Sequence, residues 1–131
     1  MLIWYMACPF CDLQKSRIIY AGENIFVIYS NPRLMKDHLL VIPKRHVEKL
    51  SELNEEEKKE LIEITIRFQE KLLKKYPGCD IRQHYRPFIP QSQLSVNHLH
   101  VHLQPRKFKD ELYEKCQKYE TDIFQIKTYK Y

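Results

Sequence analysis

Three of the six histidines in this chain, His98, His100 and His102, lie within five residues and alternate with aliphatic residues. In an extended strand successive side chains point to opposite faces, so a strand over 95–104 would place all three imidazoles on one face. Residues on the same strand face repeat about every 6.6 Å, which lets two imidazoles reach one phosphate group. The spacing therefore predicts a chemical site, and the alternative is a half-buried strand whose exposed face merely carries histidine.

Cys8 and Cys11 form a Cys-Pro-Phe-Cys pair near the start of the chain. Two thiolates at this spacing can share one tetrahedral metal ion, although two ligands alone do not complete a zinc site. His46 is a candidate further ligand because it follows an apolar strand, and a surface histidine is its alternative. A redox pair of the glutaredoxin type is a second interpretation of the cysteines, and unremarkable thiols are a third.

The segments that must position these groups predict an α+β domain. Two β-branched and aromatic runs separated by turn residues predict an antiparallel hairpin, and a continuous apolar run between His38 and His46 predicts a strand buried on both faces. The predicted elements are strands at 17–20, 25–29 and 39–42, a helix at 55–75, strands at 79–86 and 95–104, and a helix at 107–120, followed by an aromatic and basic tail at 121–131 that is a strand or a dimer arm.

One long amphipathic helix is predicted with well-defined ends. Asn54 and Glu57 form a potential capping box, and Pro77-Gly78 lies just beyond the helix. Apolar residues recur at three- and four-residue spacing, so one face of the helix is expected to pack on the core. The residues expected on that face are Leu61, Ile64, Thr65, Phe68 and Leu72.

Polar residues at predicted strand ends are candidate substrate ligands. Ser30 and Asn31 follow a strand and could hold a ribose or a base, although Asn-Pro is also a turn signal. Arg82 and Gln83 could reach phosphate oxygens or a base edge if their strand pairs with the histidine strand. Exposed surface arginine is the alternative for Arg82.

Composition limits the class of protein. The chain has 131 residues, 44% hydrophobic and 30% charged, which predicts a single globular domain over 1–131. Only two glycines occur, which excludes a glycine-rich phosphate loop. The net charge of +5 suits anionic ligands such as nucleotides, while a nucleic-acid partner is not expected. No long apolar run or leader is present, so we expect no membrane association and a cytoplasmic location.

Three motifs together resemble the histidine triad (HIT) family. The run from His98 to Arg106, HLHVHLQPR, resembles the family signature His-φ-His-φ-His-φ-φ, and the run from His38 to His46, HLLVIPKRH, resembles its second marker. The pair Cys8 and Cys11 matches the zinc knuckle of zinc-bearing members. The motifs occur in the family's order over residues 8–106.

The resemblance implies an antiparallel α+β domain, usually a homodimer, that binds nucleoside phosphates and reacts at the α-phosphorus. It implies that His100 is the nucleophile and that His38 and His102 contact the phosphate. It also implies a structural zinc ion, with four protein ligands and no open position. The implied zinc ligands are Cys8, Cys11, His46 and His98.

The chain departs from the family pattern at two places. Asp37 stands where many members have glycine before the first histidine of the Val-Ile-Pro strand. Before the triad, Leu94-Ser95-Val96 replaces the usual Gln-Ser/Thr-Val, with Gln93 close but out of register. Gln93 and Ser95 are nevertheless candidate substrate ligands. A related transferase branch has Gln as its third triad residue, so His102 favours a hydrolase.

We therefore expect a nucleotide hydrolase that forms a covalent nucleotidyl-His100 intermediate, acting on a dinucleoside polyphosphate or a nucleoside phosphoramidate. A nucleotidyltransferase or phosphorylase of the same family is the nearest alternative. A metallohydrolase that uses all three triad histidines as metal ligands, and a non-enzymatic zinc-stapled nucleotide or nucleic-acid binder, are the others.

Overall fold

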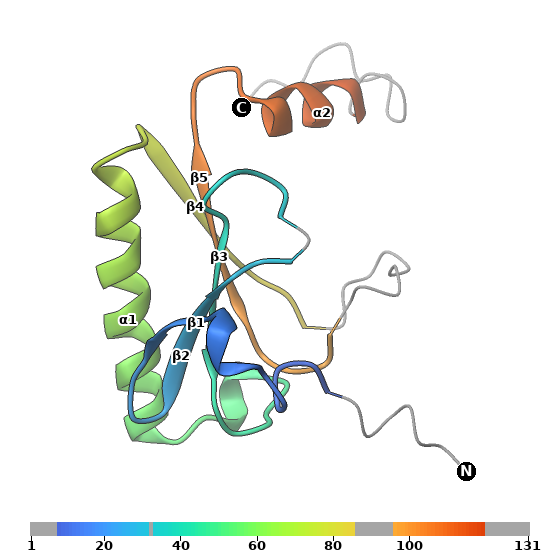
Figure 1. Cartoon of the computed structure of the whole chain (residues 1–131). Coiled ribbons are helices and arrows are strands. Elements are labelled where there is room, and N and C mark those ends of the chain that lie inside the picture. Colours follow the sequence, from blue (N-terminus) through green and yellow to red (C-terminus); the bar gives the residue numbers. More distant parts are fainter. Residues whose placement is uncertain (1–7, 32, 86–95, 120–131) are drawn as a thin grey trace.

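Five antiparallel strands form one open sheet in this computed structural model, which describes residues 8–31, 33–85 and 96–119 (Figure 1). The apolar run at 39–42 forms the central strand of this sheet, which pairs with a neighbouring strand on each side. In spatial order the strands are β1 (Ile18–Ala21), β2 (Ile25–Tyr29), β3 (Leu39–Pro43), β5 (Val101–Arg106) and β4 (Gly78–Gln83). The α+β fold class predicted from the sequence is confirmed.

Two α-helices accompany the sheet: α1 (Glu55–Leu73) and α2 (Glu111–Tyr119). Short 3-10 turns, η2 (Lys15–Arg17) and η3 (Leu50–Glu52), lie before β1 and α1. The predicted capping box is present, since the Asn54 side chain accepts from the Glu57 N–H and the Glu57 carboxylate accepts from the Asn54 N–H. Figure 1 shows α1 along one side of the sheet and α2 beyond the end of β5.

The sheet has two different faces. The α1 face is the main core, where the five predicted α1 residues are buried against alternate residues of β2, β3 and β5. The opposite face carries a smaller core made of Phe10, Phe26, Ile28, Leu40 and Ile42. Leu40 is directly opposite His102 in the β3–β5 register. Strand alternation therefore places His102 on the face away from α1, which we call the histidine face.

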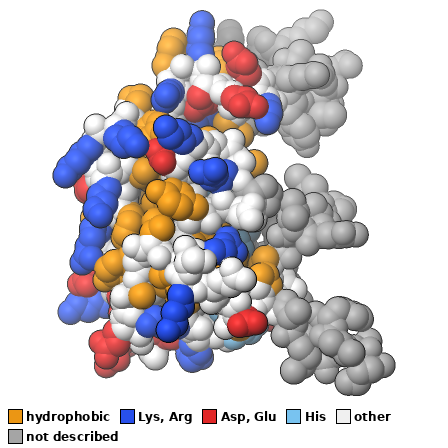
Figure 2. All heavy atoms as spheres, viewed as in Figure 1, with side chains coloured by type: hydrophobic (Ala, Val, Ile, Leu, Met, Phe, Trp, Pro, Cys, Tyr) orange, Lys and Arg blue, Asp and Glu red, His pale blue; other side chains and the backbone are white. Residues whose placement is uncertain are grey.

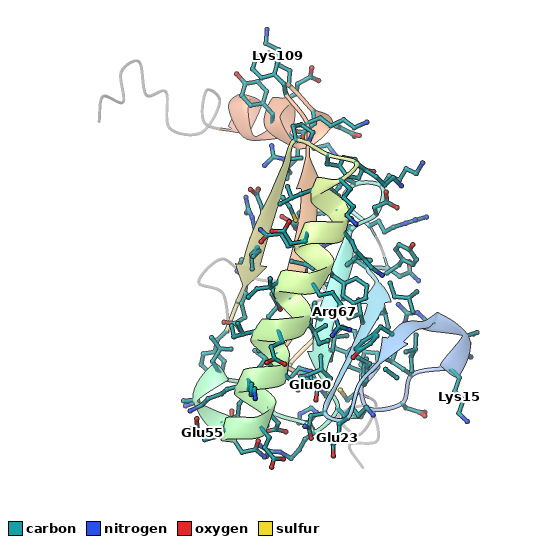
Figure 3. The ribbon with its side chains drawn as sticks, turned by 90° about the vertical axis from the view of Figure 1, so that its left-hand side faces the viewer. Lys15, Glu23, Glu55, Glu60, Arg67 and Lys109 are labelled. Carbon is teal, nitrogen blue, oxygen red and sulfur yellow. The ribbon has the colours of Figure 1, made fainter. Side chains whose placement is uncertain are left out.

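Glu60 of α1 fixes the β1–β2 turn to the helix. Its carboxylate accepts hydrogen bonds from the backbone N–H groups of Asn24 and Ile25 and from the Asn24 amide. Figure 3 shows Glu60 beside the turn that carries Glu23. These bonds satisfy backbone donors at the turn, so they help to set the position of the hairpin relative to α1.

Three predicted boundaries are wrong by three residues or more. The triad strand begins at Val101 rather than at 95, because the Leu99 N–H donates to the Val47 carbonyl at 2.7 Å instead of to a neighbouring strand. β4 ends at Gln83 rather than at 86. α2 begins at Glu111 rather than at 107, because the Asp110 carboxylate accepts from the N–H groups of Lys107 and Tyr113 and so caps the helix.

The predicted tail at 121–131 lies outside the described residues. Within the described residues, no helix combines the length and the apolar character needed to cross a membrane.

Candidate active site

His98 is buried, and its ring contacts β3 through one nitrogen and a group of potential metal ligands through the other. Its ring is 1% exposed, and Nε2 lies 2.8 Å from the Pro43 carbonyl oxygen. A carbonyl oxygen can only accept, so His98 carries its proton on Nε2 and presents the Nδ1 lone pair on the other side. A hydrogen bond of this kind is the usual outer support of a metal-ligating histidine.

The Nδ1 lone pair of His98 faces Cys8, Cys11 and His46. One ligand atom from each of the four residues lies within 4.8 Å of all the others. Three of the separations are 3.4 Å from Cys8 Sγ to His98 Nδ1, 3.1 Å from Cys11 Sγ to His46 Nδ1, and 3.1 Å between the Nδ1 atoms of His46 and His98. A tetrahedral zinc ion requires ligand separations of roughly 3.3–3.8 Å. The four residues therefore fit a closed tetrahedral site after shifts of about 1 Å in the separations of their ligand atoms.

The thiols of this cluster favour a cation. Burial and the neighbouring Cys8 thiol raise the pKa of Cys11 to about 11. Two adjacent thiolates repel each other when no positive charge lies between them. A divalent ion at this position would stabilise both thiolates, and two thiolates with two imidazoles are a donor set that zinc prefers.

His100 is held in one tautomer by the backbone. Its Nδ1 lies 2.7 Å from the His98 carbonyl oxygen, so Nδ1 carries the proton and Nε2 keeps a free lone pair. Phe10 packs edge-on against the ring, with centroids 5.2 Å apart. Burial lowers the pKa of His100 below its ordinary value, so the imidazole is neutral at pH 7. An oriented neutral imidazole of this kind can act as a nucleophile.

His38 and His102 form a hydrogen-bonded pair beside His100. The Leu34 N–H lies 3.2 Å from His38 Nδ1 and must donate to it, so His38 carries its proton on Nε2. That proton is donated to His102 Nδ1 at 2.9 Å. His102 in turn carries its own proton on Nε2. The backbone of the loop before β3 therefore sets the tautomers of two histidines in sequence.

Burial keeps the rings of His38 and His102 uncharged. Desolvation and the nearby His100 lower the pKa of His38 to about 4. Desolvation, followed by His100 and His38, lowers the pKa of His102 to about 3. The rings of His100 and His102 have centroids 4.9 Å apart. A free lone pair and an N–H donor thus stand side by side, which suits attack on phosphorus with a hydrogen bond to a phosphate oxygen.

Asp37 precedes His38 and adopts a conformation typical of glycine. Its φ is 65°, in the left-handed region. The Tyr76 hydroxyl donates to its carboxylate at 2.6 Å, and Lys75 lies 3.3 Å from the same oxygen. The hydrogen bond from Tyr76 is the main reason why the pKa of Asp37 is lowered. These contacts tie the loop before His38 to the turn that follows α1.

The predicted substrate ligands fall in different places. Ser30 is buried next to the site, and its N–H donates to the His38 carbonyl, while Asn31 is exposed. Arg82 is directly opposite His102 in the β4–β5 register and so lies on the histidine face. Gln83 is opposite Val101 on the α1 face, and its amide donates to the His84 carbonyl.

The structure thus does not bring Gln83 to the histidines, because strand alternation turns its side chain to the other face. The remaining two candidates, Gln93 and Ser95, lie outside the described residues. His84 was not singled out in the sequence. Its ring centroid lies 6.0 Å from that of His102. Its two-residue spacing from Arg82 was the signal that could have indicated a shared face.

Comparisons with known proteins identify the family. Residues 13–109 match the HIT domain, which is most of the chain. The chain belongs to the histidine triad (HIT) family. A HIT-like protein of Methanocaldococcus jannaschii is 30% identical over 106 residues, which cover 76% of this chain and 78% of that protein.

Solved structures show the same fold. A Zn-bound histidine triad family protein from Mycobacterium smegmatis matches with a TM-score of 0.67 and 27% identity, over 82% of this chain and 80% of that one. A protein from Streptococcus mutans matches with a TM-score of 0.67 and 26% identity, over 90% of this chain and 83% of that one. Metal binding is thus described for one relative with this arrangement of strands.

Proposed function

We propose that this protein is a nucleotide hydrolase that cleaves at the α-phosphorus through a covalent nucleotidyl-His100 intermediate. The observation that carries the proposal is the bond from His100 Nδ1 to the His98 carbonyl oxygen, 2.7 Å long, which leaves Nε2 unprotonated. Family membership supports the same chemistry, because the three histidines occupy the signature positions.

The reaction would occur in two displacements. His100 Nε2 attacks the α-phosphorus, and the bond to the leaving group breaks with its electron pair on that group. The cationic imidazole bonded to phosphorus is a better leaving group than an alkoxide, so water then displaces it, releases a proton to solvent and restores neutral His100. His102 Nε2–H donates to a non-bridging phosphate oxygen in both steps, and His38 holds the His102 ring in the required tautomer.

We propose that Cys8, Cys11, His46 and His98 hold a structural zinc ion. Bound there, zinc would join the N-terminal segment to the turn after β3 and to the residues before β5. The His98 carbonyl that orients His100 belongs to one of the four ligands. Metal binding would therefore stabilise the position of the nucleophile without taking part in the reaction.

The metallohydrolase alternative needs His98, His100 and His102 around one ion. In the part of the chain that the structure describes, the group of ligand atoms within 4.8 Å includes His98 but neither His100 nor His102. His100 Nδ1 faces a carbonyl, and His102 Nδ1 faces His38. These contacts favour separate roles for the three histidines.

The basic balance supports a small nucleotide as the ligand. Figure 2 shows Lys and Arg side chains along the α1 edge and spread over the displayed face, with hydrophobic and acidic side chains between them. A site built for a single nucleotide needs only a few donors, whereas long nucleic acids are bound along extended basic surfaces. We propose that the protein acts in the cytoplasm, where the Cys8 and Cys11 thiols stay reduced and able to bind metal.

A substrate panel with one matched variant tests the proposal. The wild-type protein should release AMP from diadenosine polyphosphates or from adenosine phosphoramidate. His100→Ala should lower the turnover number by about 10³-fold or more. The same variant should keep its zinc content, because no described metal-ligand contact involves His100. Turnover that survives the substitution, or zinc lost together with the ring, would contradict the assignment.

A further inference from the structure

Arg82 on β4 and His84 just after this strand extend the histidine face beyond His102. Arg82 is directly opposite His102 in the register, and His84 lies two residues further along the chain. The His84 and His102 rings are 6.0 Å apart between centroids, at 68° to each other. The β4–β5 register and this ring contact together place Arg82 and His84 beside His102 on the histidine face.

Both side chains are accessible to a ligand. The side chain of Arg82 is 47% exposed, and its Nη2 lies 3.6 Å from the Asp80 carboxylate. Asp80 is held more closely by Arg106, at 2.7 Å, so Arg82 is only loosely restrained by its own neighbour. His84 is exposed and lines a small hollow of about 20 Å³ together with Glu48 and His98. A guanidinium and an imidazole so placed can both donate to phosphate oxygens.

The order of the strands gives these donors a direction. His38 and Ser30 lie on the β3 and β2 side of His102, whereas Arg82 and His84 lie on its β4 side. With the nucleoside near Ser30 and Asn31 and the α-phosphorus at His100, the remainder of the substrate would extend over β4. That remainder is the leaving group of the first displacement.

We propose that Arg82 and His84 form a subsite for the first phosphate of the leaving group. The subsite would favour substrates whose leaving group is itself a phosphate chain over substrates that lose an amine. This inference rests on the proposed function, since it requires reaction at the α-phosphorus. It assigns to His84 a role in substrate selection, by direct contact with the substrate.

Two substrates that donate the same AMP group but differ in their leaving group test whether Arg82 and His84 contact the leaving group. Diadenosine tetraphosphate loses ATP, and adenosine phosphoramidate loses ammonia. For His84→Ala and Arg82→Ala, kcat/KM with the tetraphosphate should fall by about 10-fold or more, because each variant loses a charge-assisted or neutral hydrogen bond to phosphate. With the phosphoramidate it should stay within about 2-fold. Lys59→Ala removes an exposed positive charge from α1 and should change neither value.

Every other result contradicts either the subsite or the proposed function. Equal losses with both substrates would place the two residues on the α-phosphate or on His102, and no loss with either would remove them from the site. Both results overturn the subsite while leaving the hydrolase intact. Wild-type protein that cleaves neither substrate would contradict the proposed function. Calorimetry with inorganic pyrophosphate then tests the subsite alone: binding about 10-fold weaker in His84→Ala supports it, and equal binding overturns it.

Discussion

Asp37 has a φ of 65°, a backbone conformation that costs conformational energy for any residue with a Cβ atom. Asp37→Gly and Asp37→Ala both lose the bonds to Tyr76 and Lys75, so they differ mainly in that backbone cost. We expect the alanine variant to be less stable than the glycine variant by about 1 kcal/mol in urea unfolding. Equal stabilities, or a more stable alanine variant, would contradict the left-handed conformation.

His38 makes the free energy of unfolding depend on pH. Its pKa is lowered from 6.5 to about 4 by burial, so between these values the unfolded chain binds a proton that the folded protein does not. Stability should therefore fall as pH drops from about 6.5 to 4, by up to about 1.4 kcal/mol per pH unit from this group.

The His38→Gln variant isolates that contribution from the metal ligands, which also take up protons in acid. Its stability should fall less steeply than that of the wild-type protein over the same pH range. Urea unfolding at several pH values measures both slopes. Identical slopes for the two proteins would mean that His38 titrates normally in the fold.

The knuckle from Cys8 to Cys11 joins segments that are distant in sequence. If it holds zinc, Cys8→Ser should lower the zinc content well below one ion per chain and lower Tm by about 5 °C or more. Cys79→Ser is the matched control, because Cys79 is a free cysteine outside the ligand cluster. It should keep its zinc. Metal analysis that finds no zinc in wild-type protein purified without chelator would exclude the site.

The elements that could be predicted from the sequence are those that local signals define. The capping box at Asn54 and the regular apolar spacing locate α1, and the apolar run locates β3. The start of β5 could not be predicted, because it depends on a bond from Leu99 to Val47, about 50 residues away in the chain.

The candidate site likewise has parts that local signals predict and parts that depend on long-range contacts. Residue types and spacing indicate the Cys8 and Cys11 pair and the three triad histidines, the family resemblance implies the ligand set that includes His98, and the structure brings the four potential metal ligands together. The face on which Gln83 lies required the β4–β5 register, which no local pattern specifies. His84 was missed because it lies just beyond the end of β4, and its contact with His102 on β5 appears only in the folded chain.

One edge of the molecule is suited to a second copy of the chain. β4 is an edge strand of the described sheet, and Ile81 on it is 48% exposed. Ile62 and Ile66 on α1 are also more than half exposed. Gln69 donates to the Cys79 carbonyl, so this side of α1 lies next to β4. We propose that two chains associate as a homodimer through this apolar edge.

Light scattering tests the homodimer. The wild-type protein should have twice the mass of the chain, and Ile81→Lys should be a monomer because it places a charge in the interface. Ile19→Lys is the control, since Ile19 is 42% exposed on β1 at the opposite edge of the sheet. It should remain dimeric. A monomeric wild-type protein, or a mass unchanged by Ile81→Lys, would contradict this interface.

The central claim is that His100 forms a bond to phosphorus, and the stereochemistry of hydrolysis tests it most directly. Each in-line displacement inverts the configuration at phosphorus, so two successive displacements give net retention. A nucleotide substrate made chiral at the α-phosphorus with oxygen isotopes and sulfur should therefore yield a nucleoside phosphorothioate of retained configuration, read by phosphorus NMR. Net inversion would mean that water attacks the substrate directly, and it would contradict the nucleotidyl-His100 intermediate.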